Sequence, residues 1–237
     1  MPLPKITVPK YGLTLPSNGE KVKYRPFLVK EEKVLHMAME AGDNESQIEA
    51  MINVLTDCLE GKDEEYVREM PVFDVEYCFL QIRSKSIGEI SKPSVVCKAC
   101  EEKVEVEIDL SKIRAKKNSE HNSKIELSEG VGVIMKYPSI MDVGTNVTDS
   151  EDPSSLAINI LVDCIDMIYD PKDTYKVSEY SREELLEFVD GLTKENFDKI
   201  TEFFETMPKI TKKVAYHCPK CGCEDSIEVE GIENFFG

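Results

Sequence analysis

The sequence predicts an α+β fold, with helical N-terminal and C-terminal segments around a small antiparallel β unit. Apolar residues recur at helical spacing within 29–90 and within 151–208, as expected of helices that bury one face. Between these segments, apolar and charged residues alternate over 104–110, as in a strand with one wet face. A Cys-x-x-Cys pair lies in each of two β-like segments, 91–150 and 209–237. We therefore expect these two segments to join as one discontinuous ribbon unit.

Residues 1–28 are predicted to form an extended N-terminal arm. The arm is rich in Pro and Gly, which interrupt helices and regular strands. It ends in a passage that changes from polar to apolar, so we expect it to dock by Tyr24, Phe27 and Leu28.

Three helices are predicted after the arm, in the segment that ends at residue 90. The first covers 29–40 and ends at Gly42, a residue suited to a left-handed stop. The second covers 45–60, where the apolar residues form one continuous stripe. The third begins at Pro71, which the first turn of a helix tolerates, and ends at Gly88.

The middle of the chain changes to a β pattern. A strand over 104–110 directly follows the first Cys pair. Residues 111–124 are mostly polar and are predicted to be an exposed loop or a mobile tip. The next residues, 124–138, indicate a hairpin with its turn at 128–130.

The helical period returns in the segment 151–208. The first helix is predicted to start with Asp152 as its cap and to stay apolar nearly all round as far as Tyr169, so we expect it to be buried. A second helix within 181–191 begins with a capping box, and a third follows within 193–208.

The two Cys-x-x-Cys pairs are the strongest chemical signal in the sequence. Zinc prefers four tetrahedral nitrogen or sulfur ligands, and a Cys-x-x-Cys turn places two thiolates on one side of a metal. Gly222, after the second pair, can adopt the positive φ that such a turn needs. About half of the chain separates the pairs, so the zinc ribbon would be discontinuous. The spacing predicts a structural Zn²⁺ site with the ligands Cys97, Cys100, Cys218 and Cys221.

Two neighbours of the second pair are alternative ligands. Cys223 or His217 could take part instead, but Cys221 alone keeps the two-residue spacing from Cys218. A redox pair would open a helix in a βαβ unit, and neither pair is so placed. A metal with four thiolate ligands has no open position for water or substrate, so we expect a structural staple.

Composition and motifs argue against several classes of function. The net charge of −17, from 46 acidic and 29 basic residues, would repel a nucleic-acid backbone. The sequence lacks a signal-peptide core and any run of about 18 apolar residues, so we expect a soluble intracellular protein without membrane insertion. It also lacks G-x-S-x-G and the glycine-rich phosphate-binding motifs. We therefore expect no enzyme and no small-molecule substrate.

The C-terminal sequence GIENFFG is unusually apolar for a terminus. Its large apolar residues are Ile232, Phe235 and Phe236. Such residues either fold back onto the domain or bind a partner. We treat them as candidate partner-binding residues.

Six blocks of the sequence resemble the baseplate hub proteins of T-even-like contractile-tailed bacteriophages. The blocks are YRPFLVKEEKVLHMAME, VFDVEYCFLQIRSKSIGE, VCKAC, FFETMPKI, AYHCPKCG and GIENFFG. The resemblance implies a structural or assembly factor without catalytic turnover, whose partners are other baseplate hub proteins. It also implies a place in the virion tail baseplate, after assembly in the host cytoplasm.

Two other classes compete with this interpretation. A zinc-ribbon nucleic-acid-binding or transcription factor would explain the Cys pairs and the basic cluster within 114–117, but the net charge argues against it. A metal hydrolase would need a coordination position that is not taken by thiolate.

Overall fold

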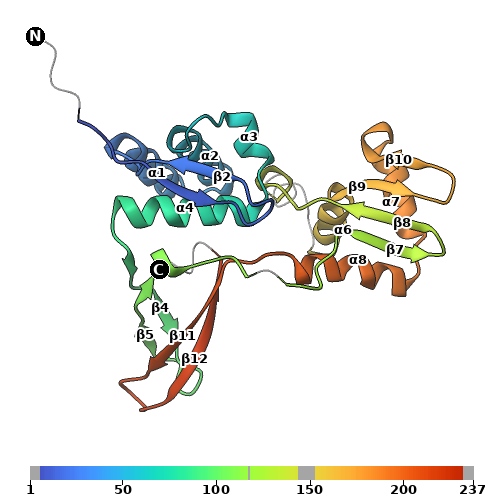
Figure 1. Ribbon diagram of the computed structural model, residues 1–237. Coiled ribbons are helices and arrows are strands. Elements are labelled where there is room, and N and C mark those ends of the chain that lie inside the picture. Colours follow the sequence, from blue (N-terminus) through green and yellow to red (C-terminus); the bar gives the residue numbers. More distant parts are fainter. Residues whose placement is uncertain (1–5, 117, 144–152, 232–237) are drawn as a thin grey trace, which may run out of the picture. The chain divides into compact units, whose positions relative to one another are not determined.

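The computed structural model describes residues 6–116, 118–143 and 153–231 (Figure 1). The chain is an α+β protein, as predicted, with helices and small antiparallel sheets. It divides into two compact units. Unit 1 comprises 1–67, 73–116 and 208–237, and unit 2 comprises 68–72 and 117–207.

Unit 1 contains the N-terminal helices and two long hairpins. Its N-terminal elements are β1 (Tyr11–Thr14), β2 (Lys21–Tyr24), α1 (Val29–Ala41), α2 (Asn44–Cys58), most of α3 (Glu64–Glu69) and most of α4 (Val72–Ser86). Its remaining elements are β3 (Ile90–Ser91), β4 (Ser94–Val96), β5 (Lys103–Glu105), β6 (Ile108–Asp109), η1 (Leu110–Lys112), β11 (Thr211–His217) and β12 (Glu224–Glu230).

Helix α4 is the central element of unit 1. Ten of its fifteen residues are buried, so its polar side chains need partners inside the protein. Asp74 accepts hydrogen bonds from the N–H and the hydroxyl of Ser17, which lies between β1 and β2. The side-chain amide of Gln81 donates to the carbonyl of Leu110 at 3.4 Å. These two contacts attach the N-terminal hairpin and the base of the ribbon to the same helix.

The N-terminal segment is a hairpin followed by a short extended stretch, where the sequence predicted an extended arm. Strands β1 and β2 pair antiparallel, and Tyr24 at the end of β2 forms an isolated antiparallel bridge with Leu59. Tyr24 and Phe27 are buried as predicted. Leu28 is 40% exposed, because it stands at the N-cap of α1 with its side chain outside the helix.

The three helices predicted in this region are confirmed as α1, α2 and α4. Gly42 ends α1 with a φ of 75°, and Asp43 caps α2 by accepting from the N–H of Ser46. The short helix α3 was not predicted, since its six residues are too few to show a period.

Unit 2 is a four-stranded antiparallel sheet with helices, in the strand order β10-β9-β8-β7. Its elements are β7 (Lys124–Ser128), β8 (Val131–Met135), α6 (Pro153–Asp163), β9 (Ile165–Tyr169), β10 (Thr174–Lys176), η2 (Val177–Glu179), α7 (Arg182–Asp190) and α8 (Lys194–Thr206). Side chains from the sheet and from all three helices form one core, centred on Val133, Ile165, Leu185 and Ile200. The predicted 124–138 hairpin and the Ser181–Glu184 capping box are both confirmed.

The long buried helix predicted as far as Tyr169 is wrong. Helix α6 ends at Asp163, where the N–H of Cys164 closes its last turn, and Ile165–Tyr169 form the inner strand β9. An apolar run suits a buried strand as well as a buried helix, so its period alone did not distinguish them. The predicted cap Asp152 lies outside the described residues.

The predicted exposed loop at 111–124 is only partly correct. Ile113 is buried at 1% exposure, and Lys116 forms an isolated backbone bridge with Lys209. Further on, His121 lies against the rings of Tyr137 and Phe203, with centroid distances of 5.5 and 4.9 Å. The polar composition of the segment gave no indication of these three contacts.

Glu31 is a buried carboxylate at the start of α1, with only 3% of its surface exposed. It accepts hydrogen bonds from Arg25 at 2.7 Å and from the N–H of Leu28 at 2.6 Å. Burial alone disfavours the charged carboxylate, but these hydrogen bonds outweigh it and lower the pKa of Glu31 to about 2.

We predict that Glu31→Gln destabilises the protein by about 2 kcal/mol at pH 7, because the substitution removes a charge-assisted network. The carboxylate stabilises the fold above its ordinary pKa of 4.5, and this contribution is lost as the pH falls toward 2. The free energies of unfolding of wild type and variant, measured in urea, should therefore converge as the pH falls from about 5 to about 2, a range set by those two pKa values. Glu40→Gln, on the exposed part of α1, is the control. A constant difference across this range would contradict the prediction.

Candidate metal centre

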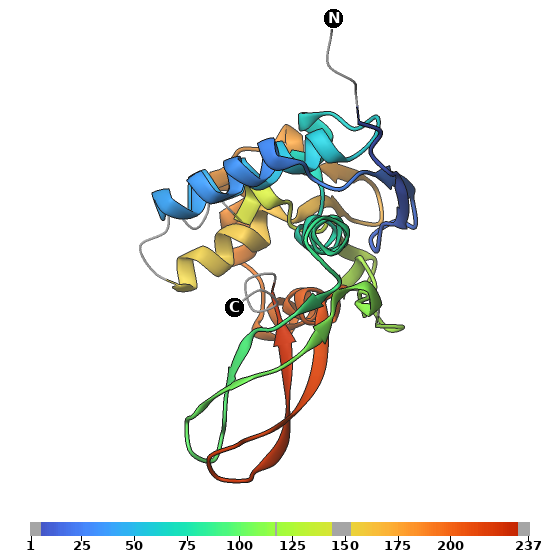
Figure 2. The ribbon, with the colours of Figure 1, turned by 90° about the vertical axis from the view of Figure 1, so that its left-hand side faces the viewer.

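The two Cys pairs lie at the tips of the two hairpins of unit 1. In the first hairpin, β3 pairs with β6 and β4 pairs with β5; in the second, β11 pairs with β12 over seven residues each. Figures 1 and 2 show the hairpins side by side, with both tips at the same end. We call the loops at 97–102 and 218–223 the first and second knuckle.

The predicted alternation within 104–110 is confirmed, although it covers two short strands rather than one. The four apolar residues are all buried: Val104, Val106, Ile108 and Leu110. The ladder is interrupted between β5 and β6, where the N–H of Val106 bonds to the carbonyl of Pro93 at 2.9 Å. Pro93 has no N–H for a regular ladder, which accounts for the interruption.

The two knuckles have the same backbone hydrogen bonds. In the first, the N–H of Cys97 bonds to the carbonyl of Glu102, and the N–H of Glu101 bonds to the carbonyl of Cys97, both at 2.8 Å. In the second, Cys218 makes the same two bonds with Cys223 and Gly222, both at 2.9 Å. The two knuckles are therefore turns of the same kind.

Glu101 and Gly222 occupy the same position in the two knuckles, four residues after the leading cysteine. Gly222 has a φ of 72°, as predicted for the turn, and Glu101 has a φ of 58°. Glu101 is the one non-glycine residue with positive φ in the part of the chain that the structure describes. A side chain at this φ is strained.

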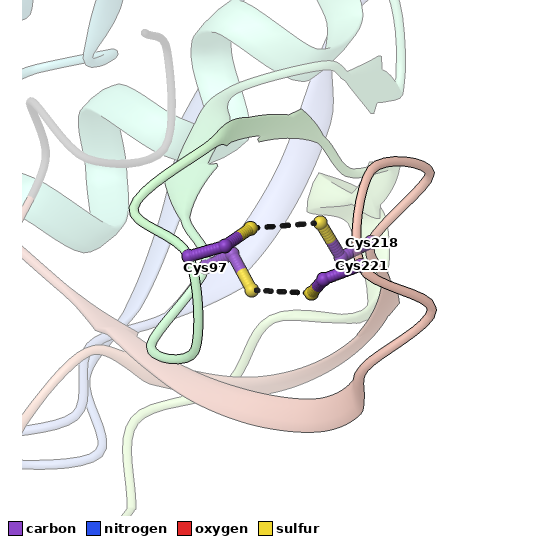
Figure 3. Close-up of side chains that lie close together, drawn as sticks. Cys97, Cys218 and Cys221 are labelled. Carbon is purple, nitrogen blue, oxygen red and sulfur yellow. Dashed lines mark hydrogen bonds between the residues drawn. The ribbon is translucent and has the colours of Figure 1, made fainter.

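The four predicted sulfur ligands come together in space, with all ligand atoms within 4.8 Å of one another. The Sγ atoms of Cys97 and Cys221 are 3.8 Å apart, and those of Cys100 and Cys218 are 3.6 Å apart. Figure 3 shows these sulfur atoms facing each other across the space between the knuckles. A tetrahedral Zn²⁺ site with Zn–S bonds of about 2.3 Å has sulfur–sulfur edges of about 3.8 Å. The observed spacing fits this geometry.

Backbone N–H groups favour the thiolate form of the leading cysteine in each knuckle. The N–H groups of Ala99 and Cys100 bond to the sulfur of Cys97 and lower its pKa to about 6. In the second knuckle, the N–H groups three and two residues after Cys218 lower the pKa of that thiol. Both leading cysteines have no exposed surface.

The pKa of the second cysteine of each knuckle is raised instead of lowered. The N–H of Glu102 favours the thiolate of Cys100, but burial and the neighbouring sulfurs outweigh it and raise its pKa to about 12. The pKa of Cys221 is also raised, although the N–H of Cys223 favours its thiolate. Four thiolates in so small a space repel one another. A cation among them would offset this repulsion.

Two ion pairs hold the knuckles to the opposite hairpins. Lys98 in the first knuckle pairs with Asp225 at 3.2 Å, and Lys220 in the second pairs with Glu102 at 2.7 Å. Both pairs are largely exposed, so each adds little stability in water. The two pairs are reciprocal, since each joins one knuckle to the opposite hairpin.

The alternative ligands lie outside the four-sulfur group. His217 points away from the buried face of β11, with 63% of its side chain exposed and its Nδ1 3.5 Å from Glu224. Cys223 lies close to Cys97, but the described group of four potential ligands does not contain it. The candidate partner-binding residues Ile232, Phe235 and Phe236 lie outside the described residues.

Two residues of the site were not predicted from the sequence. Glu101 was not recognised, although aligning CKACEE with CPKCGC places it opposite Gly222. Tyr216 was also missed: its buried hydroxyl accepts a hydrogen bond from the N–H of Lys98 at 3.2 Å. Only the pairing of the two hairpins in space reveals this contact.

The fold and the site define an α+β protein that gathers four thiols from two hairpins at one point. Within the described residues, every helix is too short or too polar to cross a bilayer. Residues 8–237 match the sequence model of the T4 bacteriophage base plate protein family. The chain belongs to this family, which confirms the resemblance seen in the sequence. Searches of curated proteins and of solved structures gave no match.

Family membership makes the chain a structural component of the phage tail baseplate. Its partners are accordingly other baseplate proteins of the virion tail.

We predict opposite effects of substitution at the two equivalent knuckle positions. Glu101→Gly should stabilise the protein by about 1 kcal/mol, because glycine relieves the strain of positive φ. Gly222→Ala should destabilise it by a similar amount for the same reason. Both effects are measurable by urea unfolding. Destabilisation by Glu101→Gly would show that the side chain of Glu101 makes a compensating contact.

Proposed function

We propose that the chain is a non-enzymatic structural or assembly component of the baseplate hub, acting through protein–protein contacts. Zn²⁺ bound by Cys97, Cys100, Cys218 and Cys221 acts in this proposal as a staple that holds the two hairpins together. The observation that carries the staple is the gathering of four sulfur atoms within 4.8 Å of one another, with two sulfur–sulfur distances that match the edge of a tetrahedral thiolate site. Family membership supports the role in the baseplate.

The chemistry of the donor set supports a structural role for the metal. Four thiolates complete the tetrahedral shell of zinc, so no position is left for water or substrate. Two of the sulfurs, those of Cys97 and Cys218, are fully buried. We therefore assign no catalytic step to this centre.

The proposed site of partner binding is the apolar C-terminal sequence with Ile232, Phe235 and Phe236. It follows β12, the last strand of the second hairpin, so the staple would also fix the point at which this sequence leaves the ribbon. Assembly with other hub proteins in the host cytoplasm is part of the same proposal.

Zinc-ribbon proteins that bind nucleic acid are the alternative class. The net charge of −17 opposes it, and two of the lysines nearest the sulfurs, Lys98 and Lys220, are paired with carboxylates. Binding of DNA or RNA with a steep salt dependence would favour this alternative.

We predict about one Zn²⁺ per chain in the freshly purified protein, measured by elemental analysis. Cys97→Ser and Cys218→Ser should lose the metal and unfold at lower urea concentration, since each removes a buried ligand. Cys223→Ser is the matched control, in the same knuckle but outside the four-sulfur group, and should retain the metal. Wild type without zinc, or ligand variants of unchanged stability, would refute the staple. Metal loss in Cys223→Ser would instead make Cys223 a ligand.

We predict that replacing Ile232, Phe235 and Phe236 together with Ala abolishes binding to co-expressed baseplate hub proteins, measured by co-purification. The apolar side chains would provide most of the contact area at a partner surface. Asn234→Ala, in the same sequence, is the control and should bind normally. Zinc content and urea unfolding show whether the triple variant keeps its fold. A folded triple variant that still assembles would rule out this surface.

A further inference from the structure

Tyr216 is the residue through which the second hairpin reaches the cysteines of the first. It lies on β11, two residues before Cys218, with 6% of its surface exposed. Its hydroxyl oxygen accepts a hydrogen bond from the N–H of Lys98, the residue next to Cys97, at 3.2 Å.

The residue paired with Tyr216 in the ladder completes this attachment. Asp225 on β12 is the cross-strand partner of Tyr216, and its carboxylate lies 3.2 Å from Nζ of Lys98. The next carbonyl, that of Ser226, accepts from the same Nζ at 3.3 Å. The second hairpin thus holds the backbone of Lys98 through Tyr216 and its side chain through Asp225 and Ser226.

This contact breaks the similarity between the two knuckles. The position two residues before Cys97 holds Val95, which is buried and has no hydroxyl to offer to the second knuckle. The residue at this position in β11, Tyr216, does hold the backbone of the first knuckle. Hydrogen bonds from outside the ligand shell orient metal ligands and strengthen binding.

We infer that Tyr216 is a positioning residue for the proposed metal centre, because its hold on the backbone of Lys98 keeps the neighbouring Cys97 at its ligand position. The inference rests on the zinc site proposed above. It goes further by assigning a role to a residue outside the ligand set, and by making the first knuckle dependent on the second hairpin for its shape.

The test is Tyr216→Phe, which removes one buried oxygen and keeps the ring. Zinc affinity is measured by competition with a chromophoric chelator, using the full-length chain. We expect a 10–100-fold weaker affinity, about the effect of losing one such supporting contact. Tyr175→Phe is the control: it removes a hydroxyl that bonds to Asp170 at 3.0 Å in unit 2, and its zinc affinity should not change.

A second measurement separates positioning of the knuckle from general stability. With Co²⁺ in place of zinc, the d–d bands of Tyr216→Phe should change in position or intensity, because Cys97 is no longer held at its place in the tetrahedron. Tyr175→Phe should keep the d–d bands of the wild type.

Wild-type zinc affinity in Tyr216→Phe, or d–d bands identical to those of the wild type, would overturn the inference and leave the staple intact. Wild type that binds neither zinc nor cobalt would overturn the staple and the inference together. The two failures are therefore distinguishable.

Discussion

The contact between the two knuckles joins parts of the chain that are far apart in sequence. The sulfur pairs that meet there are separated by 118 and 124 positions. Each hairpin has its own backbone ladder, yet the two ladders are not hydrogen-bonded to each other as one sheet. Besides the backbone bridge between Lys116 and Lys209, the contacts between the hairpins involve side chains, among them the four sulfurs, the Tyr216 hydroxyl and the ion pairs of Lys98 and Lys220. A metal ion at the sulfurs would add the one strong bond set in this group.

This arrangement affects how the ribbon can form. Closing a loop of more than a hundred residues costs conformational entropy before any contact repays it. Residues 117–207 of unit 2 lie within that loop and contain its sheet and most of its core, so their folding would shorten the free chain between the hairpins. At the proposed site one knuckle would supply two ligands only, and the remaining two would arrive when the second hairpin docks. Ribbon assembly and metal capture would then be one event.

The sequence predicted features that depend on local signals. The capping box of Ser181 and Glu184 and the left-handed stop at Gly42 were found because their chemistry lies within a few residues. The four-sulfur group was found because Cys-x-x-Cys spacing reports ligand geometry directly. The run ending at Tyr169 failed, because an apolar stretch satisfies a buried strand as well as a helix. Tyr216 could not be found, since its partner on the other hairpin is set by the tertiary fold.

The bridge between Lys116 and Lys209 has a consequence for the evolution of the chain. The two residues exchange backbone hydrogen bonds of 3.0 and 3.3 Å at the places where the sequence leaves unit 1 and returns to it. Because this bridge ties the two ends of the intervening chain together, that chain is attached to the ribbon as a closed loop. The free energy of closing a loop changes slowly with its length. Insertions and deletions between these lysines should thus be tolerated by the ribbon, and related proteins could diverge there in size while keeping both cysteine pairs.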